Sequence, residues 1–268
     1  APTPAPAPTP APAPTPAPVP VPEYIEPVLN TMHRGVKCIY IHKLNNTNII
    51  LSSGDLTKYS GDVIVNAANH GGIDGGGIDG KINEAGGINL IHARKIQMNT
   101  IRQIETGKVM ITIAGSKLFG KLKTKAVIHA VGPDYRSYGD YDTYDKQLYN
   151  AYYNSLKEAE THKYTSIGFC LLSSGIFNGI NSPNDRYPNP KKDSKYIRSP
   201  KIIRLQAIRA FVKYINRYKD TNIKEINLVI FGQENDTNKL HYNKEYNDLF
   251  QLKTALSDER NMLNIKKE

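Results

Sequence analysis

The sequence has only two cysteines and no long apolar run, and each of these two shortages excludes a class of protein. Cys38 and Cys170 stand too far apart for a metal-ligand pair, and two thiols cannot build a disulfide framework. We therefore expect two reduced, buried thiols in an intracellular protein, cytoplasmic and/or nuclear. No stretch approaches the roughly 18 to 20 apolar residues that cross a bilayer. We expect no membrane segment, no bound metal and no cofactor.

Acidic residues are also in deficit, because 35 Lys and Arg outnumber 25 Asp and Glu and the net charge is +10. Residues 185–204 alone hold seven Lys or Arg against two Asp. Such a cluster attracts polyanions such as nucleic acid, so weak polyanion binding through residues 186–204 is one hypothesis. It predicts that binding depends steeply on salt and is lost when residues 186–204 are deleted. A solvated basic loop is the alternative.

Proline occupies every second position of residues 1–22, which removes amide donors and prevents helix and sheet formation. We expect a stiff polyproline-II spacer there. Residues 1–34 are therefore assigned to a disordered Pro/Ala-rich tail and linker. Residues 35–268 are assigned to one domain with a basic insertion at about 180–200.

Short β-rich runs alternate with helical patterns after residue 35, and several runs are continuously apolar, as in strands covered on both faces. The expected strands are 36–42, 48–53, 62–67, 108–114, 126–131, 166–172 and 226–232. The expected helices are 143–162, 200–218 and 241–257, with two helical pieces over 80–97 that break at Gly86 and Gly87. This order predicts an α/β fold, a three-layer α/β/α sandwich with a mixed, largely parallel central sheet.

Six glycines fall within the fifteen residues NAANHGGIDGGGIDG (66–80), directly after an expected strand. Bare backbone between a strand and a helix lets main-chain N–H groups approach a phosphate, and the helix dipole favours the anion. The spacing fits neither the dinucleotide fingerprint nor the P-loop. On its own, the cluster is equally compatible with a flexible turn.

Four blocks in order resemble the signature of macrodomains, the ADP-ribose-binding module. They are SGDLTKYSGDVIVNAANHGGIDGGGIDGKINEAGG (53–87), TGKVMIT (106–112), VIHAVGP (127–133) and SSGIFNG (173–179), within a similarity that spans about 48–257. Asn69 and Asp79 have the separation found in the hydrolytic MacroD-type branch. The resemblance implies that the protein binds ADP-ribose and ADP-ribosylated proteins. We also expect it to be a monomer.

The resemblance also implies residue roles. Asp55 matches the carboxylate that accepts the adenine amino proton, with the Leu56 amide nearby, and Phe231 is a candidate for the adenine wall. Asn69 matches the amide that binds the distal ribose. Two turns would hold the diphosphate and this ribose: Gly76, Gly77 and Ile78 in the first, and Ser174, Gly175, Ile176, Phe177 and Asn178 in the second. Asn66 is also predicted to be a ligand-binding residue.

Asp79 is the residue on which catalysis depends. In the hydrolytic branch that the sequence resembles, the residues matching Asn69 and Asp79 orient and activate a water at the distal anomeric carbon, a task that suits an ionised carboxylate. The alternative is that Asp79 only caps the following helix, a common use of Asp.

Four residues near these blocks raise separate questions. Asp74 stands where hydrolytic members often carry glycine, and its carboxylate should weaken phosphate binding unless it points away. Asn178 replaces the usual glycine of the second turn, and asparagine tolerates positive φ. His70 is a candidate proton donor, whereas His129 is expected to be structural.

These patterns leave several functions open. The first is hydrolysis of mono-ADP-ribose from modified protein Asp or Glu, or of O-acetyl-ADP-ribose. The second is a non-catalytic reader of ADP-ribose or ADP-ribosylated proteins, which shares every pocket residue. A phosphatase acting on ADP-ribose 1″-phosphate needs the same pocket. The Ile, Asn, Lys and Tyr bias fits an AT-rich genome, with a large DNA virus as one source.

Overall fold

The computed structural model describes residues 31–137, 140–178 and 200–231, which form one eight-stranded sheet with helices on both faces. The strand order is β1-β2-β3-β8-β7-β4-β6-β5. Four central pairs, from β3 to β6, are parallel, and the outer pairs are antiparallel. The strands are β1 (Thr31–His33), β2 (Val36–Leu44), β3 (Thr47–Ser53), β4 (Val63–Ala67), β5 (Val109–Ile113), β6 (Ala126–Ala130), β7 (Ser166–Phe169) and β8 (Glu225–Ile230). The expected mixed, largely parallel sheet is confirmed.

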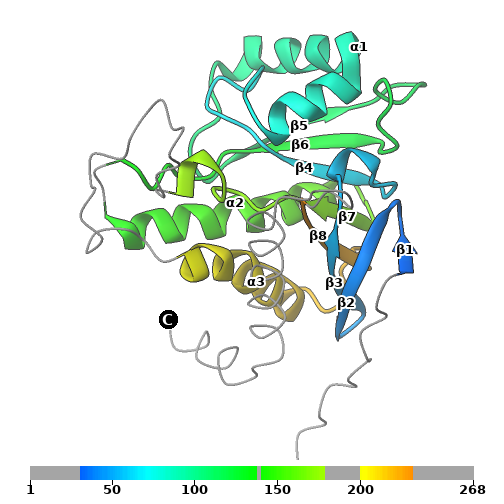
Figure 1. The fold of residues 1–268 in the computed structure, drawn as a ribbon, viewed down its shortest axis with the longest axis vertical. Coiled ribbons are helices and arrows are strands. Elements are labelled where there is room, and N and C mark those ends of the chain that lie inside the picture. Colours follow the sequence, from blue (N-terminus) through cyan, green and yellow to red (C-terminus); the bar gives the residue numbers. More distant parts are fainter. Residues whose placement is uncertain (1–30, 138–139, 179–199, 232–268) are drawn as a thin grey trace, which may run out of the picture.

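Helix α1 (Ile78–Ile101) lies on one side of the sheet, and α2 (Tyr141–Thr161) and α3 (Pro200–Arg217) lie together on the other (Figure 1). Two short 3-10 helices, η1 (Leu56–Lys58) and η2 (Ile176–Asn178), follow β3 and β7. The side chain of Asp140 accepts bonds from the Asp142 and Thr143 amides and so caps α2. The architecture is the expected three-layer α/β/α sandwich.

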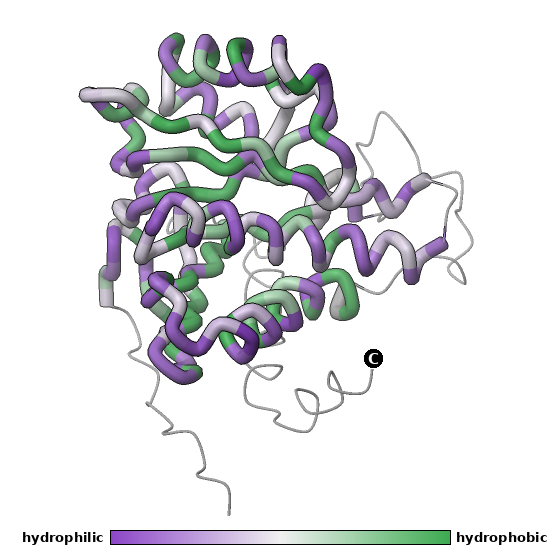
Figure 2. Tube along the Cα trace, turned by 180° about the vertical axis from the view of Figure 1, so that it is seen from behind, coloured by the Kyte–Doolittle hydropathy of each residue, from purple (hydrophilic) through white to green (hydrophobic). Residues whose placement is uncertain are grey.

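The core is made mainly by the central strands, whose side chains are covered on both faces. Every residue of β6 is buried, and the first four of β4 are too. Figure 2 shows these strands as largely hydrophobic, while the helices alternate between apolar and polar residues. Burying continuous apolar strands under two helical layers provides the main driving force for this fold.

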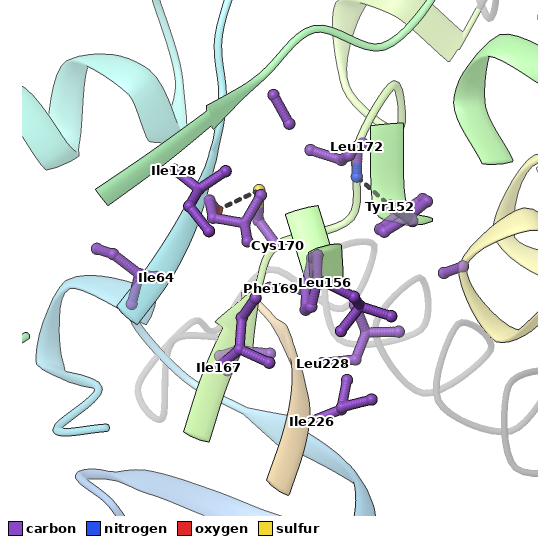
Figure 3. Close-up of a cluster of buried hydrophobic side chains, with 14 of the residues drawn as sticks. Ile64, Ile128, Tyr152, Leu156, Ile167, Phe169, Cys170, Leu172, Ile226 and Leu228 are labelled. Carbon is purple, nitrogen blue, oxygen red and sulfur yellow. Dashed lines mark hydrogen bonds between the residues drawn. The ribbon is translucent and has the colours of Figure 1, made fainter. Parts of the chain in front are cut away.

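Aromatic rings join the helical layer to this sheet. The ring of Phe169 on β7 lies 5.7 Å from that of Tyr152 and 4.9 Å from that of Phe211. The Tyr152 hydroxyl accepts a 2.7 Å bond from the Leu172 amide, and the Cys170 thiol donates to the Val65 carbonyl (Figure 3). The segment after β7 is therefore fixed from both sides, which matters for the turn that follows.

The expected interruption of the 80–97 helix is confirmed at Gly87, whose φ of 65° and ψ of −165° are not helical. An L-residue with a β-carbon rarely adopts this conformation, so glycine is required there. The break divides α1 into a first piece that carries Asp79 and a second that carries Arg94.

The sheet begins earlier than expected. Thr31–His33 pairs antiparallel with β2 through Thr31↔Cys38, so a boundary between residues 34 and 35 falls inside a hairpin. Alternation over three residues is too short a signal to identify such a strand. The Pro/Ala-rich tail, residues 186–199 of the basic stretch and the expected helix 241–257 lie outside the described residues. Within the described ranges, none of the helices is both long and apolar enough to span a bilayer.

Candidate functional site

The predicted site residues gather at one edge of the sheet, where neighbouring parallel strands end. The order β3-β8-β7-β4 brings four carboxyl ends side by side. Gly54 and Asp55 follow β3, Phe231 follows β8, the turn 173–178 follows β7, and Asn69 follows β4. The carboxyl edge of an open α/β sheet is where such folds bind ligands. Residues far apart in sequence therefore share a single candidate site.

The first turn, residues 75–77, presents exposed backbone directly before α1. A β-carbon built on Gly76 or Gly77 would meet nothing within 4 Å. Gly77 is the N-cap of α1, and its φ of 61° with ψ of −131° requires glycine. Open space above a helix N-terminus without side chains is suited to an anion such as a phosphate.

Asp79 does not cap this helix. Gly77 occupies the N-cap position, and no side chain accepts a hydrogen bond there. Instead, Asp79 Oδ1 accepts a 2.7 Å bond from Arg94 Nη1 and a 2.5 Å bond from Asn66 Nδ2. All three side chains are buried, and the exposed fractions of Arg94 and Asn66 are 0%. The prediction that Asp79 only caps the helix is therefore wrong. The Asp79 carboxylate forms an ion pair with Arg94 instead.

The second oxygen of Asp79, Oδ2, is buried and has no hydrogen-bond partner among the described residues. A β-carbon on Gly75 would lie 2.7 Å from this oxygen and 3.3 Å from Asn69 Nδ2. Because Gly75 has no side chain, the Asp79 carboxylate and the Asn69 amide can both lie close against its backbone. Asn69 is anchored because its Oδ1 accepts from the Gly72 amide at 3.1 Å and its Nδ2 donates to the Asp74 carbonyl at 2.6 Å.

A buried chain of hydrogen bonds lies beneath Asp79. Asn66 Nδ2 lies 3.1 Å from His129 Nδ1, and His129 Nε2 lies 3.0 Å from Thr112 Oγ1. Complete burial, with the nearby positive charge of Arg94, holds the pKa of His129 well below its usual value. The ring is therefore neutral: Nδ1 accepts from the amide, and Nε2–H donates to Thr112. His129 is structural, as expected, and Asn66 is turned toward Asp79; its ligand contact stays a prediction.

The second turn, residues 174–178, is held by hydrogen bonds from its own polar side chains, and Gly175 faces open space. Ser174 Oγ donates to the Leu171 carbonyl at 2.8 Å, and Asn178 Nδ2 donates to the Ser174 carbonyl at 2.8 Å. A β-carbon on Gly175 would meet nothing within 4 Å. Asn178 has no positive φ, so its amide bond, and not its tolerance of that conformation, accounts for its place in the turn.

Phe177 is fixed from the loop that follows β6. Its carbonyl accepts from the Tyr135 amide at 2.9 Å, and the Arg136 guanidinium lies 5.5 Å from its ring centroid. Asp134 orients that guanidinium through bonds of 2.9 Å to Nε and 2.7 Å to Nη2. The aromatic ring predicted to contact the distal sugar therefore has a defined position.

The far end of the site is formed by β3 and β8. Asp55 Oδ1 accepts from the Thr57 amide at 2.9 Å and from its hydroxyl at 2.8 Å, which holds the carboxylate in place. Leu56 is buried beneath. The Gly54 amide bonds to the Ile230 carbonyl, so Asp55 and Phe231 follow neighbouring strands at the same edge of the sheet. Phe231 is 61% exposed, and an exposed ring at the same edge as an acceptor suits a nucleobase.

Other residues near the site are committed elsewhere. His70 Nδ1 bonds to the Ile104 carbonyl at 2.8 Å, and its Nε2 lies 3.3 Å from Thr106 Oγ1, so both ring nitrogens are engaged. Burial, reinforced by the charge of Asp79, raises the pKa of Cys170 to about 12, which keeps this thiol protonated. Asp74 is exposed on the turn.

Arg94 is the site residue that the motifs missed. It stands in an i, i+4 row of buried α1 residues, namely Ile82, Gly86, Leu90, Arg94 and Met98. A charged residue within an apolar row is almost never buried without a partner, so the row itself was the available signal. No local rule could have indicated that the partner is Asp79, fifteen positions earlier.

The fold and site define an α/β/α protein with two glycine-containing turns and a buried, half-paired carboxylate at the carboxyl edge of its sheet. The model of the macro domain family matches residues 65–181. A macro domain-containing protein of Listeria monocytogenes is 36% identical over 187 residues, which cover 70% of this chain and 92% of that protein. The chain therefore belongs to the macrodomain family.

Further relatives agree with this assignment. A protein named O-acetyl-ADP-ribose deacetylase from Escherichia fergusonii is 41% identical over 131 residues, covering 49% of this chain and 70% of that protein. The Oceanobacillus iheyensis macrodomain solved with ADP has a TM-score of 0.58 and 25% identity, with 81% of this chain and 98% of that chain covered. A Trypanosoma brucei macrodomain solved with ADP has a TM-score of 0.52 and 25% identity, with 75% and 69% covered.

Proposed function

We propose that this macrodomain binds ADP-ribose along the carboxyl edge of its sheet and hydrolyses an ester at the distal ribose. The observation that supports hydrolysis most is Asp79 Oδ2, a buried carboxylate oxygen without a partner among the described residues, beside Asn69. The names of relatives support it as well, because those from Escherichia fergusonii and Escherichia coli are O-acetyl-ADP-ribose deacetylases.

Each part of ADP-ribose has a complementary surface in this arrangement. The adenine ring lies between Asp55 and the exposed ring of Phe231. The diphosphate lies against the bare backbone of residues 75–77 and 174–176, where main-chain N–H groups and the N-terminus of α1 favour negative charge. The distal ribose then extends toward Asn69 and the ring of Phe177. Solved macrodomains of Oceanobacillus iheyensis that contain ADP or ADP-ribose support this ligand.

The reaction needs a nucleophilic water beside the distal anomeric carbon. Asn69 orients this water and Asp79 Oδ2 accepts its proton, so the oxygen attacks the carbon as the bond to the ester oxygen breaks. The products are ADP-ribose and the released carboxylate, with the proton passing from Asp79 to solvent. Because Oδ1 is occupied by Arg94 and Asn66, only Oδ2 can perform this role.

The substrate that we propose is mono-ADP-ribose on protein Asp or Glu side chains, with O-acetyl-ADP-ribose using the same groups. A reader that binds without hydrolysis would share the pocket, and it differs only in what Asn69 and Asp79 do. The half-paired state of Asp79 favours the enzyme, because a reader has no need of a buried carboxylate oxygen left without a partner.

Calorimetry with ADP-ribose tests the binding half of this proposal. Removing a hydrogen bond to a charged group costs about 1.5–3 kcal/mol, so Asp55→Ala should weaken binding roughly 10- to 100-fold. Asp220→Ala makes the same charge change on an exposed residue at the opposite edge and should bind like wild type. Equal affinity for all three proteins would contradict the assigned adenine site.

A single-turnover assay on an auto-ADP-ribosylated transferase tests the hydrolytic half. We expect wild type to release the label, and Asp79→Ala to bind ADP-ribose while releasing the label at least 100-fold more slowly, as when a catalytic base is lost. Label retained by wild type that binds ADP-ribose would establish a reader. Equal release by wild type and Asp79→Ala would remove Asp79 from the mechanism.

A further inference from the structure

Resting on the proposed function, we propose that Arg94 is a positioning residue that fixes Asp79 so that Oδ2 alone faces the substrate. Arg94 itself is closed off from solvent. Its side chain is 0% exposed and lies on the far piece of α1, beyond the break at Gly87. It therefore acts through another residue and not on the substrate.

One guanidinium connects α1 to the segment that precedes the first turn. Arg94 Nε donates to the Gly72 carbonyl at 2.7 Å, and Nη1 donates both to Asp79 Oδ1 at 2.7 Å and to Asn83 Oδ1 at 2.6 Å. Asn83 in turn donates to the Ile73 carbonyl at 2.9 Å. The planar fork of arginine suits this arrangement, because its donors point in fixed and different directions.

The way in which Arg94 binds the carboxylate is decisive. Arginine commonly grips both oxygens of a carboxylate with two parallel bonds. Here Nη1 contacts Oδ1 alone, and Asn66 Nδ2 adds a second bond to the same oxygen. All the described hydrogen bonds to the Asp79 carboxylate therefore fall on Oδ1, and Oδ2 has no partner among the described residues. A bidentate grip would occupy both oxygens.

The geometry also indicates that the ion pair between Arg94 and Asp79 does more than stabilise the fold. Nη2 of Arg94 is buried without a hydrogen-bond partner among the described residues, as is Asp79 Oδ2. A pair optimised for stability alone would bring these two atoms together, since unsatisfied buried polar atoms are costly. The observed arrangement gives up that contact and keeps the oxygen beside Asn69.

Arg94→Lys tests the inference, because lysine retains the charge but cannot span Gly72, Asp79 and Asn83 together. Loss of an outer-shell residue that orients a metal ligand typically costs 10- to 100-fold in activity, and we take the same factor for a carboxylate oriented by hydrogen bonds. We expect kcat for ester hydrolysis to fall by this factor, with the calorimetric Kd for ADP-ribose within about threefold of wild type. Asp62→Asn, which removes a bonded carboxylate at the opposite sheet edge, controls for lost stability and should keep wild-type kcat.

Several results would overturn the inference. An unchanged kcat in Arg94→Lys, with or without a weaker Kd, would show that Arg94 does not act through Asp79. An equal loss of kcat in Asp62→Asn would show the same. Should Arg94→Lys not fold, Asn83→Asp places a competing carboxylate on Nη1 at a half-buried site; it should lower kcat and leave Kd unchanged, and unaltered kcat would refute the role. Wild type that binds without hydrolysing would refute the proposed function instead, and this inference with it.

Discussion

Gly75→Ala is the substitution that most sharply tests the placement of Asp79 and Asn69. The new methyl group would lie 2.7 Å from Asp79 Oδ2 and 3.3 Å from Asn69 Nδ2. It would therefore displace the two side chains that we propose hold the attacking water. Gly75 is exposed and its φ is not positive, so the backbone itself tolerates alanine.

The size of the effect follows from this geometry. Ordinary van der Waals contact begins at 3.4 Å, so the carboxylate oxygen has to retreat by about 0.7 Å or the turn has to move outward. Misplacement of a reacting group by about 1 Å can cost about 100-fold in rate. We expect Gly75→Ala to lower the single-turnover rate of label release roughly 100-fold, with little change in the thermal midpoint.

Two alanine variants serve as controls for this prediction. A β-carbon on Gly115, after β5, meets nothing within 4 Å, so Gly115→Ala should match wild type throughout. Gly76→Ala also clashes with no protein atom, but it faces the proposed diphosphate and should weaken ADP-ribose binding instead of the chemical step. A Gly75→Ala protein that releases label at the wild-type rate would refute the assigned water position.

The remaining predictions concern the rims of the site and the opposite edge of the sheet. Phe231→Ala should weaken ADP-ribose binding about 10- to 100-fold in calorimetry, from the loss of base stacking, and leave the melting temperature unchanged. Asp74→Asn removes a carboxylate near the proposed diphosphate and should tighten binding several-fold at low salt but not at high salt. Burial alone would raise the pKa of Asp62, but bonds from Lys125 and Thr165 outweigh it and lower the pKa to about 2. Its stabilising contribution, about 1 kcal/mol after solvent screening, is therefore present above about pH 4 and lost as the pH falls to 2. Acid-unfolding curves should show this loss in wild type and not in Asp62→Asn, and identical curves would refute it.

Much of the fold could be predicted because its signals are local. Continuous apolar runs identified the central strands, and helical spacing identified α2 and α3 to within two residues at each end. The break near Gly87 followed from paired glycines in a helical pattern. Strand β1 was missed because three residues carry too little periodicity, and the antiparallel edges could not be read from alternation of elements alone.

In the candidate site, too, the residues in local motifs could be predicted, and those that depend on tertiary contacts could not. Asp55, Asn69, Asp79 and the two glycine turns were located from motifs, and the parallel order of β3, β8, β7 and β4 then places them along one edge. The partners of Asp79 were not predictable, because Arg94 and Asn66 reach it only through tertiary contacts. The N-cap interpretation of Asp79 was wrong for the same reason: the cap is glycine, and the carboxylate serves a contact fifteen residues away.

A crystal structure of the wild-type protein soaked with ADP-ribose tests the central claim most directly. We predict a diphosphate lying between the backbone of residues 75–77 and that of residues 174–176, with the distal ribose above Gly75 and within reach of Asp79 Oδ2. A nucleotide bound elsewhere, or a diphosphate contacted by only one of these turns, would contradict the account.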